Sequence, residues 1–210
     1  MTVTIHPYNP RGPLRRYVDG AIVASYQAAF SGFPWNSPVA MEEARKCFRN
    51  HKRKPGFEGL IATATNVTLF RPMGALLPFR VSNQHDLLAA IWWDCPTEKQ
   101  LATERGEELA KFVHDKGMIP FVWEREVLVR PEYQGKKIGL ALRRAFIETV
   151  RVRYGTCWVF TRMREDNIPI IRIAEKLGYK PIGIRVPANE ALGIGHEYWY
   201  RWVNTWEMEI

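Results

Sequence analysis

The sequence changes from a strand pattern to a helix pattern across one short loop that contains two glycines and two adjacent lysines. Residues 119–129 (IPFVWEREVLV) give the strongest strand pattern in the chain, and residues 138–154 have the spacing of an amphipathic helix. The loop at residues 134–140 (QGKKIGL) must therefore turn the chain and start a helix. Backbone N–H groups at a helix N-terminus point outward and, together with the helix dipole, favour an anion.

The residues of this loop favour a phosphate as that anion. Gly135 and Gly139 let the backbone approach a bulky group, while Lys136 and Lys137 add positive charge. A basic surface turn is the alternative interpretation. The loop does not end in the Gly-Lys-Ser/Thr of a Walker loop, and the sequence contains no Gly-x-Gly-x-x-Gly. An NTPase and a Rossmann dehydrogenase are therefore both disfavoured.

The rest of the chain mixes strand and helix patterns. Strand patterns also occur at residues 3–8, 58–70, 87–93, 156–161, 178–187 and 195–206. Helix patterns occur at residues 14–30, from Ser37 as N-cap and Pro38 to about residue 54, at 97–117, where Gly106 weakens the pattern, and at 169–177. Because no repeat or linker divides the sequence, we expect one mixed α/β domain over residues 1–210, with helices on the faces of its sheet.

The net charge of the chain limits the classes of ligand that it is expected to bind. Lys and Arg number 30 against 22 Asp and Glu, which gives a net charge of +8. Such a surplus suits nucleic acid or a polyanionic coenzyme. Since no predicted helix carries a continuous basic face, nucleic acid is disfavoured.

Neither a membrane nor a metal is indicated. No apolar run approaches the roughly 18–20 residues of a membrane span, and the first residues lack a signal-peptide pattern. Cys47, Cys95 and Cys157 are far apart and form no metal-binding cluster, so we expect no metal, no disulfide and a cytoplasmic location. Cys157 lies in an apolar strand pattern and is interpreted as a small buried side chain rather than a nucleophile.

Two segments resemble the GNAT-type N-acetyltransferases. VLVRPEYQGKKIGLAL is similar to the acyl-CoA signature Arg/Gln-x-x-Gly-x-Gly/Ala of that family, with Gln134 first, Gly139 last and Lys137 in place of the middle glycine. NIPIIRIAEKLGYKPIG is similar to the family helix that begins with Asn167 and closes in Leu-Gly-Phe/Tyr. The resemblance covers about residues 121–184, and the two motifs lie in the expected order.

This resemblance implies a GNAT-like acyl-CoA N-acyltransferase fold, with a mixed, mostly antiparallel central sheet and helices on both faces. It also implies acetyl-CoA as the acetyl donor, held by a core at about residues 119–185. The strand end would pair with pantetheine, the loop would hold the pyrophosphate, and Asn167 would hydrogen-bond the pantetheine region. The cofactor-binding residues implied are Val127, Leu128, Val129, Gln134, Gly135, Lys136, Lys137, Ile138, Gly139, Leu140 and Asn167.

Two glutamates are the candidates for the catalytic base. An ammonium acceptor must lose a proton before its nitrogen attacks a thioester, and a partly buried carboxylate suits this role. Glu124 and Glu126 lie two residues apart and share one face of the predicted strand. Because relatives often carry a carboxylate near Glu126, it is the first candidate and Glu124 the second. An exposed strand face, with charge offset by Arg125, is the alternative.

The general acid of the family has no counterpart here. Many relatives carry a Tyr where this chain has Ala174, so the CoA thiolate would take its proton from water or from Tyr198 or Tyr200. A catalytically silent acyl-CoA-binding module is therefore the alternative to an enzyme. Tyr179, in the Leu-Gly-Tyr segment, is interpreted as a core residue.

The acceptor side is less defined than the donor side. Residues 12–55 are compatible with the acceptor-side helices and loops of the family, and Phe33 and Trp35, in a proline-broken loop, are the candidate substrate-binding residues. The acceptor would be a primary amine of a small molecule or a peptide, whose identity the residues leave open. A homodimer formed through the Trp-rich final strand is a further hypothesis.

Overall fold

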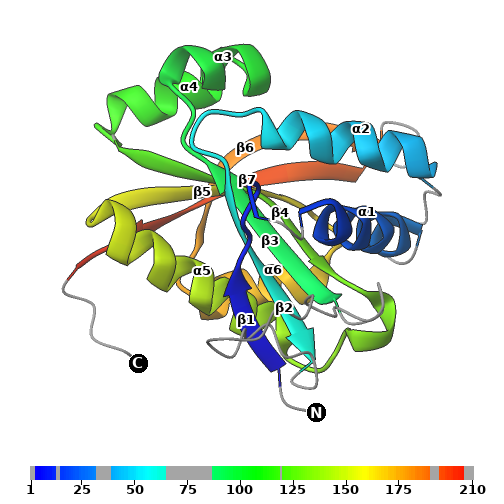
Figure 1. The fold of residues 1–210 in the computed structure, drawn as a ribbon. Helices are drawn as coiled ribbons and strands as arrows, with labels where there is room; N and C mark the ends of the chain where they lie inside the picture. Colours follow the sequence, from blue (N-terminus) through cyan, green and yellow to red (C-terminus); the bar gives the residue numbers. More distant parts are fainter. Residues whose placement is uncertain are drawn as a thin grey trace. The chain divides into compact units, whose positions relative to one another are not determined.

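A computed structural model of the chain describes residues 3–12, 15–31, 39–64, 87–118, 120–189 and 194–205. Within them lie seven strands: β1 (Val3–Pro7), β2 (Glu58–Ala64), β3 (Leu87–Asp94), β4 (Phe121–Val129), β5 (Cys157–Arg164), β6 (Lys180–Asn189) and β7 (Ile194–Val203). The helices described are α1 (Arg15–Ser31), α2 (Met41–Lys52), α3 (Glu98–Arg105), α4 (Glu107–Asp115), α5 (Ile138–Tyr154) and α6 (Ile168–Lys176) (Figure 1). A short 3₁₀ turn at Pro131–Tyr133 joins β4 to the glycine loop.

The strands form one sheet in the order β1-β2-β3-β4-β5-β7-β6. β4 and β5 run parallel, while β1 with β2, β5 with β7 and β6 with β7 run antiparallel. Helix α5 connects the parallel pair, as a crossover between parallel strands requires. The predicted mixed α/β sheet is confirmed.

The chain divides into two compact units that share strands β3 and β4 and helix α5. Unit 1 comprises Met1–Arg53, Glu58–Trp92 and Glu126–Arg143, and unit 2 comprises Lys54–Phe57, Trp93–Arg125 and Arg144–Ile210. Each unit is assembled from three separate stretches of chain, so neither unit is a continuous segment of the sequence. The expectation of a single domain over residues 1–210 stays a prediction.

Helices contact both faces of strand β3. Successive strand residues point to opposite faces, so the buried Trp92 and Trp93 face opposite sides. In unit 1, Tyr26 of α1 and Phe48 of α2 pack on Trp92, with ring centroids 6.4 and 5.2 Å away. In unit 2, Phe146 of α5 packs on Trp93 at 4.9 Å. The predicted helices on both faces are thus present at this strand.

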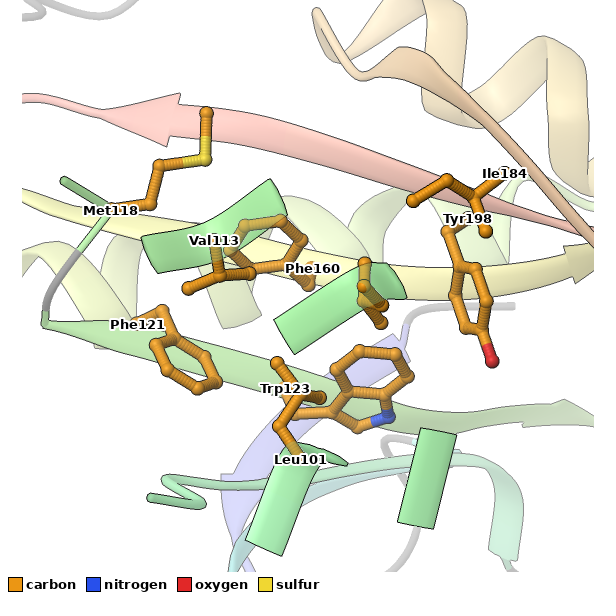
Figure 2. Packing of buried hydrophobic residues seen from close by; sticks show 9 residues of the cluster. Leu101, Val113, Met118, Phe121, Trp123, Phe160, Ile184 and Tyr198 are labelled. Atoms are coloured by element: carbon orange, nitrogen blue, oxygen red, sulfur yellow. The ribbon is translucent and has the colours of Figure 1, made fainter. Parts of the chain in front are cut away.

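The core of unit 2 is an aromatic and aliphatic cluster on one face of β4, β5 and β7 (Figure 2). Its buried members are Leu101, Leu109, Val113, Met118, Phe121, Trp123, Phe160, Ile184 and Tyr198. Trp123 and Tyr198 meet edge to face with ring centroids 5.8 Å apart, a geometry that adds to the stabilisation from burial. Helices α3 and α4 supply Leu101, Leu109 and Val113, and β6 supplies Ile184.

The single helix expected over residues 97–117 is wrong, because it is two helices. Gly106 has φ of 97°, which no helical residue adopts, and α3 ends and α4 begins there. Thr97 and Gln100 form a capping box at the start of α3. The glycine that weakens the sequence pattern is therefore the residue that breaks the helix.

The predicted start of the second helix is also wrong. Val39 and Ala40 are not helical, and α2 begins at Met41 rather than at Pro38. Ala40 is the N-cap residue and gives no side-chain hydrogen bond, but Glu42 and Glu43 place negative charge in the first turn. These carboxylates favour a helix start there through the helix dipole.

Cys157 is the small buried side chain that its sequence context predicts. All three cysteines are thiols rather than disulfides, and Cys157 is completely buried. Burial raises the pKa of the Cys157 thiol to about 11, which keeps it protonated and unreactive. Among the residues described, no helix is both long enough and apolar enough to cross a membrane.

Candidate acyl-CoA site

The loop between β4 and α5 has a left-handed residue where the family signature has a glycine. Lys137 has φ of 62° and is the one non-glycine residue with positive φ in the described part of the chain. Gly135 has φ of 75°. An L-residue with a side chain adopts this conformation at a cost of roughly 1–2 kcal/mol. The loop therefore keeps the backbone conformation of a glycine while carrying a lysine.

Helix α5 begins immediately after Lys137 with outward-pointing donors. The Ala141 N–H donates to the Lys137 carbonyl at 3.1 Å, so Lys137 is the N-cap residue. The first N–H groups of a helix, here those of Ile138, Gly139 and Leu140, have no acceptor inside it. A lysine side chain has no acceptor atom with which to cap them. The start of this 17-residue helix is thus chemically suited to an anion.

Side chains of the loop tie it to the end of β4. The Gln134 Nε2 donates to the Val129 carbonyl at 3.2 Å. Arg130 and Lys136 both lie over the ring of Tyr133, with the cationic groups 5.9 and 5.0 Å from its centroid. The Arg130 N–H donates to the Leu88 carbonyl of β3 at 3.1 Å. These contacts gather positive charge beside the loop and fix its distance from β4.

Only the first half of β4 pairs with β5, and the second half continues beyond that pairing. Their parallel register covers Phe121–Glu124, whereas Val127, Leu128 and Val129 come after it. Leu128 is buried, with 2% of its surface exposed, while Val127 and Val129 are half-buried. The boundary between the two compact units falls within β4, between Arg125 and Glu126.

The two candidate glutamates have different surroundings. Glu126, in unit 1, is half-buried and lies near Tyr26 and Cys47, whose thiol donates to the Tyr26 hydroxyl oxygen at 3.3 Å. Burial, and after it the negative charge of Glu126, raise the pKa of the Tyr26 hydroxyl. Burial likewise raises the pKa of the Cys47 thiol, with a smaller contribution from Glu126. Glu126 thus faces a tyrosine that stays protonated and can donate a hydrogen bond.

Glu124, in unit 2, is a core carboxylate. Its exposed fraction is 1%, and it accepts hydrogen bonds from the Tyr179 hydroxyl at 3.0 Å and from the Thr161 hydroxyl at 3.5 Å. Tyr179 is itself buried, as expected for a core residue. Sequence reasoning missed both hydroxyl partners, because they lie 55 and 37 residues away along the chain.

Asn167 caps the start of helix α6, and the backbone at the end of that helix is closely hydrogen-bonded. The Asn167 side-chain oxygen accepts from the Ile170 N–H at 3.4 Å, so this residue caps the helix. Ala174 is fully buried, and its carbonyl accepts from the N–H groups of Leu177 and Tyr179 at 3.0 Å each. A side chain as large as tyrosine would not fit at that position without rearrangement.

Solved structures of several N-acetyltransferases have this architecture. The chain aligns over its whole length with all of the ribosomal-protein-S18-alanine N-acetyltransferase from Escherichia coli, at TM-score 0.59 and 13% identity. It also aligns with Arabidopsis thaliana NAA60 in complex with acetyl-CoA, at TM-score 0.60 and 15% identity over 96% of this chain and 99% of that one. An N-acetyltransferase from Staphylococcus aureus Mu50 gives TM-score 0.59 and 12% identity over 97% of this chain and all of its own.

The fold is that of the GNAT-type N-acetyltransferases. At the level of sequence, no family model matches the chain, and no curated protein matches it significantly. The GNAT resemblance carried by the two short motifs is therefore confirmed by the fold rather than by overall sequence similarity.

In this GNAT fold the candidate tyrosines for proton donation are packing residues. Tyr198 belongs to the unit 2 core and has 1% of its surface exposed. Tyr200 is half-buried and packs against Phe112 and Trp158, with ring centroids 6.1 and 5.5 Å away. Their role as general acid stays a prediction. The two candidate substrate-binding residues, Phe33 and Trp35, lie outside the described residues.

A cluster of three arginines and one histidine in unit 2 was missed by the sequence reasoning. It consists of Arg105 at the end of α3, Arg162 and Arg164 on β5, and His196 on β7; we call it the arginine cluster. Burial, followed by the nearby arginines, lowers the pKa of His196 to about 4 and lowers the pKa of Arg105. The signal in the sequence was the alternation of Arg162 and Arg164 with apolar residues, which extends the strand beyond Thr161.

Proposed function

We propose that this protein transfers the acetyl group of acetyl-CoA directly to a primary amine of a small molecule or peptide. The observation that carries this proposal is the glycine-like conformation of Lys137 at the start of α5, within a GNAT fold. A strained backbone persists where surrounding structure requires it, and at a helix N-terminus it points to a bound anion. One structure with this fold, that of Arabidopsis thaliana NAA60, contains acetyl-CoA.

The coenzyme would use two parts of the β4–α5 segment. The backbone of Val127, Leu128 and Val129 would pair with the pantetheine arm as an added strand does, and Asn167 would donate to the pantetheine region. The outward N–H groups of the loop, Gln134 to Leu140, would bind the pyrophosphate. Lys136 and Arg130 would add positive charge at the loop, which fits a chain with net charge +8.

Glu126 would be the base. The ammonium of the acceptor gives one proton to the Glu126 carboxylate, directly or through a water molecule, and its nitrogen then attacks the thioester carbonyl carbon. A C–N bond forms and the C–S bond breaks; the new amide nitrogen gives its second proton to water, and the departing CoA thiolate takes a proton from water. Tyr26 supports this assignment because its protonated hydroxyl lies near Glu126 and can help to orient it. Glu124 is less suited, since two hydroxyl groups already bind it in the core.

A catalytically silent acyl-CoA-binding module is the second candidate. It is favoured by Ala174, which is fully buried and leaves no hydroxyl where many GNAT relatives have one. Both candidates bind acetyl-CoA, and only the enzyme releases free CoA in the presence of an amine. We further infer a cytoplasmic location from the three thiols.

Calorimetric titration with acetyl-CoA and a free-thiol assay over a panel of amines test the proposal together. We expect Glu126→Gln to lower turnover about 100- to 10,000-fold while acetyl-CoA affinity is unchanged. Glu107→Gln, at an exposed position of α4, is the matched control and should leave both quantities at their wild-type values. Full activity of the Glu126 variant would reject its role as base. Binding without thiol release for any amine would favour the silent module, and no binding would reject both candidates.

A further inference from the structure

The arginine cluster lies on the same sheet face as the aromatic core of unit 2. In the antiparallel register of β5 with β7, Arg162 is opposite Tyr198 and Arg164 is opposite His196, and directly opposed residues share a face. The Arg105 guanidinium approaches from α3 and lies over the ring of Trp123, 5.2 Å from its centroid. Trp123 and Tyr198, whose rings pack edge to face (Figure 2), therefore lie on the same sheet face as Arg162 and next to Arg105.

The positive charge of the cluster is only partly balanced. Arg164 pairs with Asp166, whose carboxylate oxygens lie 2.6 Å from its nitrogens. Glu104, next to Arg105 in sequence, is already bound by Lys54 and Arg125. Neither Arg105 nor Arg162 forms an ion pair with any carboxylate in the part of the chain that the structure describes.

One donor of the cluster is buried and unused. The Nε–H of Arg105 is shielded from solvent and has no hydrogen-bond partner within the described residues. An unpaired buried donor on a charged group costs free energy, because the group has lost water and gained nothing in return. The positive charges of Arg105 and Arg162 also repel each other. An oxyanion between them would satisfy the donor and offset the repulsion at once.

The cluster lies at the end of the sheet where chemistry is expected. β4 and β5 are parallel and pair as far as Glu124 with Thr161, so Arg162 is the next residue toward the carboxyl end of β5. Ligands of parallel α/β sheets bind outside the carboxyl ends of the strands. The residues of the cluster are also different from those of the loop, residues 134–140, that is proposed to hold the pyrophosphate.

We infer that Arg105 and Arg162 form a subsite for a carboxylate of the acceptor, so that the acceptor is an amine that also carries an acidic group. Amino acids and peptides with an acidic side chain or a free C-terminus belong to this class. The inference rests on the proposed acetyl transfer for its acceptor, but not for the binding of the anion. The same guanidinium groups would also bind a phosphate of the coenzyme, and the experiments separate these two sources.

The first experiment needs no activity. Sodium glutarate, a dicarboxylate probe, is titrated into the full chain while the Arg105 Nε–Hε resonance is followed by NMR, with glutaramide as the uncharged control. We expect a saturable shift with glutarate, none with glutaramide, and loss of the shift in Arg162→Gln. Arg144→Gln, which removes an exposed arginine of α5, should keep the shift. No shift with glutarate would overturn the subsite.

The second experiment compares amino acids with the corresponding amino acid amides as acceptors. We expect Arg162→Gln to raise KM for the amino acids about 10- to 100-fold, the loss of one charged hydrogen bond, and to leave KM for the amides unchanged. Arg162→Lys should retain part of the preference. A rise in the Kd of acetyl-CoA instead would place the anion on the coenzyme and overturn the acceptor assignment. A glutarate shift without acetyl transfer to any amine would reject the proposed function and keep the anion subsite.

Discussion

Two arginines lie against the same tryptophan and differ in how their charge is balanced. The guanidinium groups of Arg105 and Arg125 are 5.2 and 5.6 Å from the ring centroid of Trp123. Arg125 is bound by Asp94 at 2.8–2.9 Å and by Glu104 at 2.8 Å, and Lys54 pairs with Glu104 in turn. Arg105 has no such carboxylate in the described residues.

The difference separates a structural role from a binding role. The side chains of Arg125 and Asp94 are 3% and 1% exposed. Because water does not reach them, the charge of each is balanced mainly by the other. Arg105 contributes its charge to an unbalanced cluster with Arg162, which disfavours the folded state slightly in the absence of a ligand. In unit 2 the paired arginine, Arg125, stabilises the fold, and the unpaired Arg105 is the one proposed to bind an anion.

The largest expected effect comes from breaking the balanced pair. Arg125→Met should lower the free energy of unfolding by about 3–5 kcal/mol, because Asp94 would be left as a buried charge without its partner. Burial already raises the pKa of Asp94, and the hydrogen bonds of Arg125 oppose that rise. Urea unfolding followed by circular dichroism measures the change.

Two further variants decide whether charge balance is the reason. Arg105→Met removes a guanidinium from the same ring, and we expect the free energy of unfolding to change by less than about 1 kcal/mol. Arg125→Met combined with Asp94→Asn should recover much of the lost stability. A loss for Arg105→Met as large as that for Arg125→Met would contradict the comparison.

The next effect depends on pH and involves the unbalanced cluster. His196 has its pKa lowered from 6.5 to about 4, first by burial and then by Arg162, Arg164 and Arg105. Its unfolded form binds more protons between these two values, so stability present above pH 6.5 should be lost as the pH falls toward 4. We expect a loss on the order of 1–2 kcal/mol.

Urea unfolding at a series of pH values, compared between wild type and His196→Gln, measures that loss. The pH dependence should be smaller in the variant. NMR titration of His196 in Arg162→Gln should show its pKa moving back toward 6.5, since Arg162 is the strongest charge acting on it. An unchanged pKa would mean that Arg162 does not face His196.

The smallest expected effect concerns the loop at residues 134–140 in unit 1. There the unfavourable free energy comes from the backbone conformation of Lys137 rather than from unbalanced charge. Lys137→Gly should raise the free energy of unfolding by about 0.5–1 kcal/mol, because glycine adopts φ of 62° without steric cost. Lys136→Gly is the matched control, since its φ is not positive and the same change should lower stability by a similar amount. Thermal unfolding compares the two, and equal effects of the same sign would argue against strain at Lys137.

Local sequence patterns predicted most of the secondary structure, but they could not predict contacts between residues far apart in the sequence. Helix α5 has the predicted bounds, Ile138–Tyr154, because its amphipathic spacing is regular and its start is marked by the glycine loop. The Lys137 position was identified from a motif six residues long. The arginine cluster could not be found in this way, since Arg105, Arg162 and His196 come together only when α3, β5 and β7 pack.

The interleaving of the two units has a consequence for how the protein is made. The chain passes from one unit to the other between residues 53 and 54, 57 and 58, 92 and 93, 125 and 126, and 143 and 144. During synthesis, unit 1 lacks its last segment until Arg143 has been added, and unit 2 lacks the partner of β5 until β7 is complete. Folding must therefore wait for pairings between segments far apart in sequence, which slows it. Until those pairings form, the tryptophan-rich strands of a nascent chain lack their partners, and such unpaired strands are prone to aggregation.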